Sequence, residues 1–319
     1  MHQPEVSLKN FHYEHDIRYT LQMCQWVLKS IGMWPFIYSQ TSRLEQIVSI
    51  GLVATCVFGL CFILVPSGVF IFFAERNLYM KVKLFGPFGF CMSALIKYCY
   101  MGLKGTLFGR CIDYVENDWR KVEDPDHRSI MLKHVATSRH LITVCAVFLY
   151  TGGMLYHTVM QFLSKERISK NFTVRPLAYP CYDGILDTQV TPVYEIVFSV
   201  HCFCAMIMYS VTTAAYSLAA VFVTHISGQI QILIARLDDL VETRLNNDVR
   251  RDPLAVIVRD HVKILRFSKS AEVALREICL AEIVQSTISI CLLEYYYSII
   301  IPLIMYNIIN IFNEVQQVH

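Results

Sequence analysis

Long uncharged segments separated by charged loops dominate the chain. The clearest of them cover 46–74, 141–163 and 196–234. A helix of about 20 residues crosses the hydrocarbon layer of a membrane, so each segment is long enough for one crossing. A fourth stretch, 84–103, contains Lys97, whose long side chain can carry its amine to the membrane interface. The pattern therefore predicts several transmembrane helices.

A fifth apolar segment begins near Ile278 and contains Pro302. We predict an all-α membrane protein, a polytopic helical bundle, with a cytoplasmic N-terminal segment (1–46) and a transmembrane domain (47–313). The expected spans are 47–65, 82–103, 141–163, 194–226 and 276–297, with a partial span at 299–313.

The composition agrees with lipid as the main solvent. Hydrophobic residues make up 55% of the 319 positions and charged residues 17%, and the mean hydropathy is +0.42. These values are too apolar for an ordinary soluble domain. The net charge of +2 is spread over the loops, which argues against nucleic-acid binding. Most of the 12 cysteines lie inside apolar runs, where they pack as small hydrophobic residues, so no disulfide framework is indicated.

Basic residues predict the orientation of the helices. Segments 1–43, 104–139 and 235–269 hold nineteen lysines and arginines, whereas segments 66–83 and 164–191 hold seven. Loops rich in these residues stay in the cytoplasm. We therefore expect a multi-pass protein of the plasma membrane with a cytoplasmic N-terminus. This orientation argues against G-protein-coupled receptors, because those proteins place the N-terminus outside the cell.

The same topology places the 164–191 loop outside the cell. It contains the acceptor triplet Asn171-Phe172-Thr173, and we expect Asn171 to be accessible for glycosylation. The first 43 residues carry charges throughout and do not resemble a signal peptide.

An amphipathic pattern continues beyond the fourth span. Apolar residues recur at helical spacing after Ile226, with charged residues between them, until Pro253 breaks the pattern. The pattern then resumes and leads into the fifth span. We predict that segment 227–270 forms cytoplasmic extensions of the fourth and fifth helices. The alternative is a helix pair lying on the lipid headgroups.

Three groups of motifs resemble insect odorant receptors, over about residues 21–296. The end of that family's fourth helix is resembled by Thr224-His225-Ile226-Ser227-Gly228-Gln229-Ile230-Gln231-Ile232-Leu233 with Arg236-Leu237. Its second outer loop is resembled by Arg175-Pro176-Leu177-Ala178-Tyr179-Pro180 with Thr191-Pro192-Val193-Tyr194-Glu195. The entry of its fifth helix is resembled by Asp260-His261-Val262-Lys263-Ile264-Leu265-Arg266-Phe267 with Cys291-Leu292-Leu293.

This resemblance implies a seven-transmembrane olfactory receptor subunit that binds a small volatile odorant. It also implies a hetero-oligomeric, tetrameric ligand-gated cation channel formed with a shared co-receptor and embedded in membrane lipid. In the family the seventh helix lines the pore. The sequence given ends at His319, and its tail from Tyr297 does not resemble the family's sixth helix, so we expect a C-terminally truncated member. A gustatory receptor of the same superfamily and a small-solute transporter are the alternatives.

Small volatile ligands need an apolar, aromatic cavity with few polar contacts. Side chains at helical spacing in the outer halves of the second, third and fourth spans suit this purpose. Gly153 leaves space beside its helix, and His157 and His201 are ionisable groups at membrane depth, which are costly and often functional. Core packing is the alternative for each aromatic residue. The candidate ligand-binding residues are Phe85, Phe88, Met92, Tyr150, Gly153, His157, Phe198, His201 and Ala205.

Enzyme chemistry is not indicated. The segment His201-Cys202-Phe203-Cys204 offers metal-ligating side chains, but structural zinc needs four ligands and no second pair lies in any span. Neither G-x-S-x-G nor H-E-x-x-H occurs. We therefore expect a receptor without catalytic activity, cofactor or metal.

Overall fold

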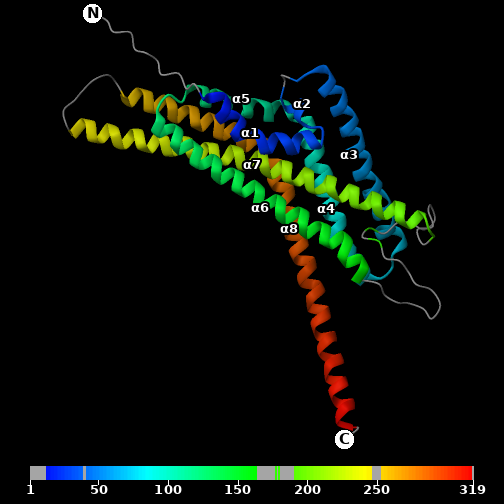
Figure 1. Cartoon of the computed structure of the whole chain (residues 1–319). Helices are drawn as coiled ribbons and strands as arrows, with labels where there is room; N and C mark the ends of the chain where they lie inside the picture. Colours follow the sequence, from blue (N-terminus) through cyan, green and yellow to red (C-terminus); the bar gives the residue numbers. More distant parts are fainter. Residues whose placement is uncertain are drawn as a thin grey trace, which may run out of the picture. The chain divides into compact units, whose positions relative to one another are not determined.

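The computed structural model describes residues 12–38, 41–163, 177, 179, 190–245 and 253–317, and every regular element among them is a helix (Figure 1). The predicted all-α fold class is confirmed. The proposed glycosylation site, Asn171, lies outside the described residues. The elements are α1 (Tyr13–Ser30), α2 (Trp34–Ile37), α3 (Arg43–Val69), the π-helical turn η1 (Phe70–Ala74), α4 (Leu78–Leu103), α5 (Gly105–Lys121), α6 (Pro125–Leu163), α7 (Val193–Leu245) and α8 (Pro253–Gln317).

Four helical segments in the described part are long and apolar enough to cross a membrane. They are Arg43–Ala74, Pro125–Val159, Val193–Glu242 and Leu254–Tyr295. The expected span 82–103 lies in α4, a 26-residue helix that is not among these four. It stays a prediction.

The two longest helices, α7 and α8, follow one another in the chain on either side of residues 246–252. α7 continues without interruption from Val193 to Leu245, well beyond the expected end of its span at residue 226. Pro253 is the first residue of α8, a position where its missing N–H costs no helical hydrogen bond. α8 then passes through Pro302 and ends at Gln317, so the helix is not divided at this proline.

The chain forms two compact units. Unit 1 consists of Met1–Val57, Lys97–Leu155 and Tyr209–Ile278, and unit 2 consists of Phe58–Ile96, Tyr156–Met208 and Cys279–His319. Unit 1 therefore contains α1, α2 and α5 together with parts of the longer helices.

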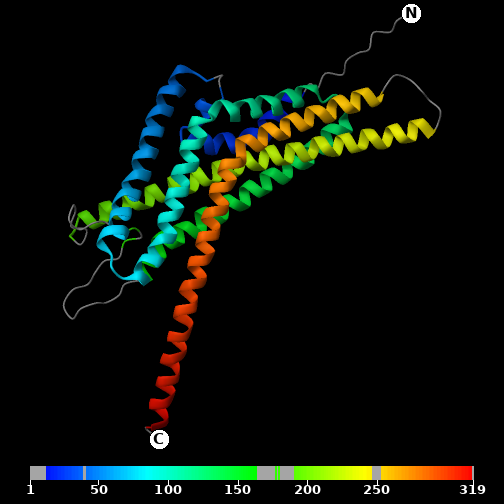
Figure 2. The ribbon, with the colours of Figure 1, turned by 180° about the vertical axis from the view of Figure 1, so that it is seen from behind.

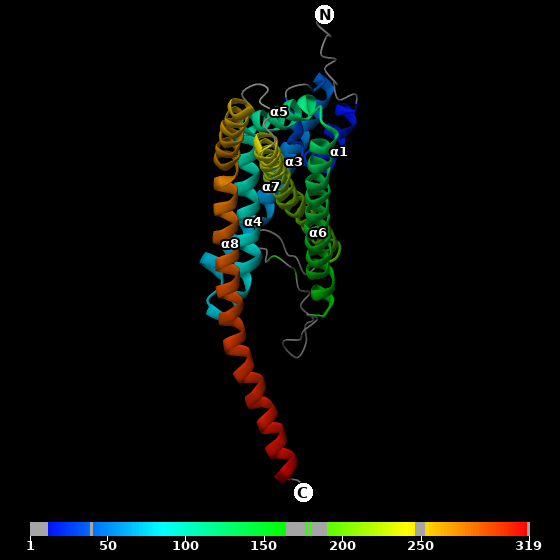
Figure 3. The same ribbon diagram turned by 90° about the vertical axis from the view of Figure 1, so that its left-hand side faces the viewer.

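Helix α5 packs against α1 and α2 in unit 1, and its Tyr114 side chain contacts the first part of α8 (Figures 2 and 3). Its buried side chains recur at helical spacing, at Phe108, Ile112, Val115 and Trp119. This spacing gives one apolar face that packs against the neighbouring helices. Gly109 lets the α5 backbone approach the carbonyl oxygen of Ile37 in α2 more closely than a side chain would allow.

A buried ion pair joins α1 to α6 within the same unit. Both oxygens of Asp16 accept hydrogen bonds from Arg128, at 2.6 and 2.8 Å, and Asp16 is completely buried. A fork of two parallel hydrogen bonds fixes the orientation of both groups.

Unit 2 contains the end of α3, the beginning of α4 and the beginning of α7. The end of α3 and the beginning of α4 lie close together (Figure 2), and the Cys91 thiol donates to the Leu60 carbonyl oxygen at 3.7 Å. At Gly59 a Cβ atom would lie 3.1 Å from the sulfur of Cys204, which shows that α3 also approaches α7 closely.

Candidate functional site

Four aromatic side chains, three of them buried, gather in unit 2: Phe62, His157, Tyr179 and His201, which we call the ring cluster. The Tyr179 ring centre lies 5.4 Å from that of His157 and 5.7 Å from that of His201. Phe62 meets His201 edge-on at 6.4 Å. His157, Tyr179 and His201 are each at most 3% exposed. Side chains from α3, α6, α7 and the α6–α7 connection thus meet in one buried place.

The ring cluster combines broad apolar surfaces with few polar atoms. The Tyr179 hydroxyl contacts the Met208 sulfur at 3.9 Å, a weak acceptor. Edge-to-face contacts between rings are favourable because the positive edge of one ring meets the negative face of the next.

The sequence identified only part of this cluster. His157 and His201 were predicted ligand residues, and the structure brings both against Tyr179. Neither Phe62 nor Tyr179 was predicted as a ligand residue. Tyr179 did belong to an outer-loop motif that resembles the family's, which was the available signal.

The two predicted phenylalanines of α4 lie together in a second aromatic group. Phe85, Phe88 and Phe72 of η1 contact one another edge-on, with ring centres 5.8–6.3 Å apart. Met92, one turn further along α4, is 37% exposed. A ligand role for these three predicted residues stays a prediction.

Two predicted residues of α7 belong to the same unit. Ala205 is completely buried one helical turn after His201, whereas Phe198 is half-buried and stacks on Tyr194 with ring centres 6.1 Å apart. Ala205 therefore borders the ring cluster, and Phe198 takes part in a separate aromatic pair.

Tyr150 and Gly153 lie in unit 1. The Tyr150 hydroxyl is 2.7 Å from that of Ser210, and its ring meets Tyr209 edge-on. The space expected beside Gly153 is filled by Tyr209, because a Cβ atom at Gly153 would lie 2.6 Å from Cε1 of that ring and closer still to its hydroxyl end. The glycine serves the close approach of α6 to α7. A direct ligand contact remains a prediction.

A buried ionic group, which the sequence did not reveal, connects α5, α7 and α8 in unit 1. Asp118 accepts a hydrogen bond from His225 at 3.1 Å and a second from Lys263. Burial acts to raise the pKa of Asp118, but these two bonds outweigh it and the pKa lies below its ordinary value of 3.8. Asp118 is therefore a carboxylate at neutral pH.

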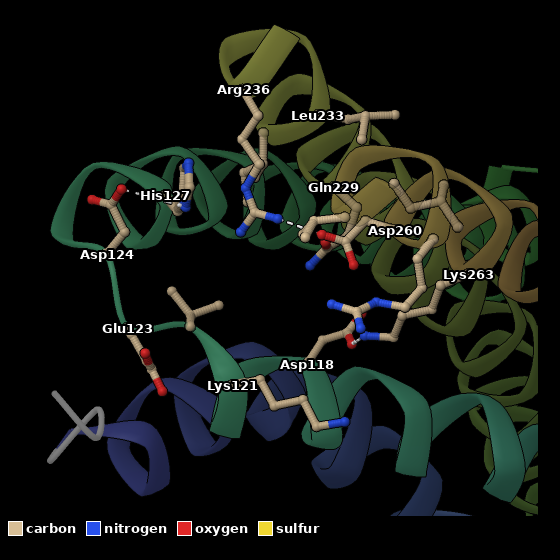
Figure 4. A pocket seen from close by; sticks show the side chains of 15 residues that line it. Asp118, Lys121, Glu123, Asp124, His127, Gln229, Leu233, Arg236, Asp260 and Lys263 are labelled. Atoms are coloured by element: carbon tan, nitrogen blue, oxygen red, sulfur yellow. Dashed lines mark hydrogen bonds and ion pairs between the residues drawn. The ribbon is translucent and has the colours of Figure 1, made fainter. Parts of the chain in front are cut away.

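Beside this ionic group lies a cavity of about 490 Å³ (Figure 4). Arg236 points into it and pairs with Asp260, while Lys121 enters from α5. The lining holds as many acidic as basic side chains and includes none of the predicted ligand residues. It is formed by Asp118, Lys121, Val122, Glu123, Asp124, His127, Gln229, Ile232, Leu233, Arg236, Val256, Arg259, Asp260, Lys263 and Ile264.

Metal-ligating side chains do not gather among the described residues. No three His, Cys, Asp or Glu side chains there could hold a metal ion together, and this includes the segment around His201 and Cys204.

Comparison with solved structures shows what this fold resembles. Two structures of the insect olfactory receptor OR5 from Machilis hrabei, one of them in complex with eugenol, superimpose with a TM-score of 0.66. Each is 13% identical in sequence, and the match covers 89% of this chain and 72% of the other. A search of curated proteins found no match.

The sequence also matches a family model described as 7tm Odorant receptor. The match extends over residues 77–312, well over half of the chain, and includes α4 to α8 except for the last residues of α8. Together with the apolar helices, it identifies a multi-pass membrane protein. The chain belongs to the 7tm Odorant receptor family.

Proposed function

We propose that this odorant receptor binds small volatile compounds at the ring cluster, between His157, Tyr179 and His201. The observation that carries the proposal is that the rings of His157 and His201 both contact the ring of Tyr179, and that all three side chains are buried. An aromatic ligand whose ring took the position that the Tyr179 ring occupies would contact the imidazoles of both His157 and His201. Binding would then rest on shape and on dispersion between rings.

The comparison supports this ligand class. One Machilis hrabei receptor structure contains eugenol, a small phenol, and the two chains share the fold. A phenol resembles the side chain of Tyr179 in size and polarity. Four other predicted residues of unit 2, Phe85, Phe88, Met92 and Phe198, would line the approach to the cluster.

We further propose that the receptor acts in the plasma membrane as one subunit of a cation channel, together with the family's shared co-receptor. The excess of basic residues in segments 104–139 and 235–269 supports a cytoplasmic N-terminus. The uncharged segments of the sequence are the basis for the crossings that we propose, at 47–65, 82–103, 141–163, 194–226 and 276–297, with a partial span at 299–313. A ligand opens such a channel only if it binds the open state more tightly than the closed state.

The test is to express the chain with the co-receptor and record currents evoked by volatile phenols. Replacing His201 by phenylalanine keeps a ring but removes its nitrogens, and replacing Tyr179 by alanine removes the central ring. Each change should alter the ligand concentration for half-maximal response by about tenfold, the effect of one good contact. Phe203→Leu is the matched control, because Phe203 lies on the same helix and is 57% exposed.

Two results would count against the proposal. Unchanged responses to every active ligand in both variants, at normal surface expression, would remove the ring cluster from the binding site. Responses to sugars or bitter compounds alone would instead favour the gustatory alternative.

A further inference from the structure

A second cavity in unit 1 lies between α5 and the first part of α8, and we call it the basic cavity. Its volume is about 580 Å³, within the range of cavities that hold small molecules. Four of its lining side chains are basic and one is acidic. The lining consists of Tyr114, Lys121, Arg259, Asp260, Val262, Lys263 and Arg266.

Two of these charges are already balanced. Asp260 pairs with Arg236, and Lys263 pairs with Asp118. Lys121, Arg259 and Arg266 form no ion pair with any described residue. Three positive charges around the cavity thus lack an acidic partner in the part of the chain that the structure describes.

The spacing along α8 concentrates this charge. Arg259, Lys263 and Arg266 are separated by four and three residues, which places them on one face of the helix. Like charges at this spacing repel each other. An anion between them would replace this repulsion by attraction, and guanidinium groups bind phosphate oxygens through paired hydrogen bonds.

The neighbouring cavity of Figure 4 has a different charge balance. Glu123 and Asp124 supply additional carboxylates there, so that acidic and basic side chains are equal in number. The two cavities share Lys121, Arg259, Asp260 and Lys263, but the basic cavity adds Arg266 and is not lined by Glu123 or Asp124, so the excess of positive charge lies on its side. An anionic ligand would be attracted to the basic cavity rather than to its neighbour.

We propose that the basic cavity binds a compact group with several phosphates, held by Lys121, Arg259 and Arg266. Two sources share this chemistry: the headgroup of a phosphorylated inositol lipid and a soluble inositol phosphate. The inference rests on charge and geometry in unit 1 and does not depend on which odorant the receptor detects. A compact ligand fits the cavity better than an extended acidic peptide, which needs a longer groove.

The aromatic residue of the cavity argues against a nucleotide. The Tyr114 ring stacks on Phe267 at 4.4 Å, and the Lys263 amine lies 5.2 Å from its centre. Its hydroxyl donates to the Lys263 carbonyl oxygen at 2.8 Å. The ring is thus committed to internal contacts and does not offer a face for stacking a base, which leaves phosphate recognition as the main chemistry of the cavity.

The experiment compares the two sources with the purified full chain. In one arm, inositol trisphosphate is titrated onto receptor in detergent, and binding is followed by thermophoresis. In the other, the receptor is placed in nanodiscs that contain either phosphatidylinositol bisphosphate or unphosphorylated phosphatidylinositol, and its thermal unfolding is compared. A soluble ligand predicts tight binding in the first arm, whereas a lipid ligand predicts stabilisation by the phosphorylated lipid that exceeds the effect of the soluble headgroup.

Charge-removing variants connect either result to the cavity. Arg259→Gln and Arg266→Gln should each weaken binding by about tenfold, and Arg259→Lys should retain part of it. Lys269→Gln removes the same charge from an exposed position of α8 that does not line the cavity, and it should have little effect. Absence of binding in both arms would overturn the proposal, and so would an equal loss in the Lys269 variant. Preference for an acidic peptide over both phosphate probes would also overturn it.

Discussion

The Nε2 atom of His225 lies 3.1 Å from an Oδ atom of Asp118, and both side chains are almost completely buried. Lys263 reaches the other oxygen of the same carboxylate. Three helices that are far apart in the sequence, α5, α7 and α8, therefore meet at one charge. Removal of one member of a buried charged group leaves the others uncompensated.

Replacing Asp118 by asparagine should accordingly destabilise unit 1. We expect a loss of about 2 kcal/mol, less than for a fully buried ion pair because Lys263 is partly exposed. The melting temperature of the purified receptor should fall by roughly 5 °C. Asp113→Asn, at an exposed position of the same helix, is the control and should melt close to the wild type. Equal melting of both variants would show that the buried carboxylate contributes little.

The same carboxylate should produce a distinct acid sensitivity. Its pKa in the folded protein is below the ordinary value of 3.8, so its stabilising contribution is fully present above about pH 4 and is lost as the pH falls through the folded value. Melting temperatures measured between pH 6 and about pH 3 should therefore fall more steeply for the wild type than for Asp118→Asn. Parallel curves for the two proteins would contradict this prediction.

Periodicity and the uncharged runs predicted the all-α fold class, but not the contacts between distant positions. The uncharged runs and the break at Pro253 follow from the local sequence, because both depend on residues a few positions apart. The link from Asp118 to His225 and Lys263 joins segments more than a hundred residues apart, and nothing in the local pattern of α5 indicates it. The Tyr209 ring fills the space beside Gly153, and this contact likewise depends on the packing of α6 against α7.

The buried amine of Lys97 allows a comparison between two neighbouring threonines of α7. Lys97 donates a hydrogen bond to the Thr212 hydroxyl at 3.2 Å, whereas the equally buried Thr213 hydroxyl has no hydrogen-bond partner among the described residues. Thr212→Val should therefore destabilise the receptor by about 1–2 kcal/mol, since it removes an acceptor from a buried cation. Thr213→Val should be neutral or slightly stabilising. Thermal unfolding of the two variants measures the difference, and equal losses would show that the Lys97 bond does not matter.

Adjacent glycines in α6 provide the sharpest test of the packing in unit 1. A Cβ atom at Gly153 would overlap the buried ring of Tyr209, whereas a Cβ atom at Gly152 meets nothing within 4 Å. Gly153→Ala should therefore cost about 1–3 kcal/mol, the usual effect of overpacking, and lower surface expression. Gly152→Ala should be tolerated.

A second change separates packing from ligand binding at Gly153. Tyr209→Leu removes the ring atoms that a new Cβ would meet, so Gly153→Ala should cost much less in the Tyr209→Leu background than in the wild type. Surface expression and melting temperature of the two single variants and the double variant complete the cycle. If the costs simply add, Tyr209 does not set the requirement for glycine. If the double variant instead regains surface expression, an altered odorant response would indicate a direct role of this position in ligand binding, because the packing defect would already have been relieved.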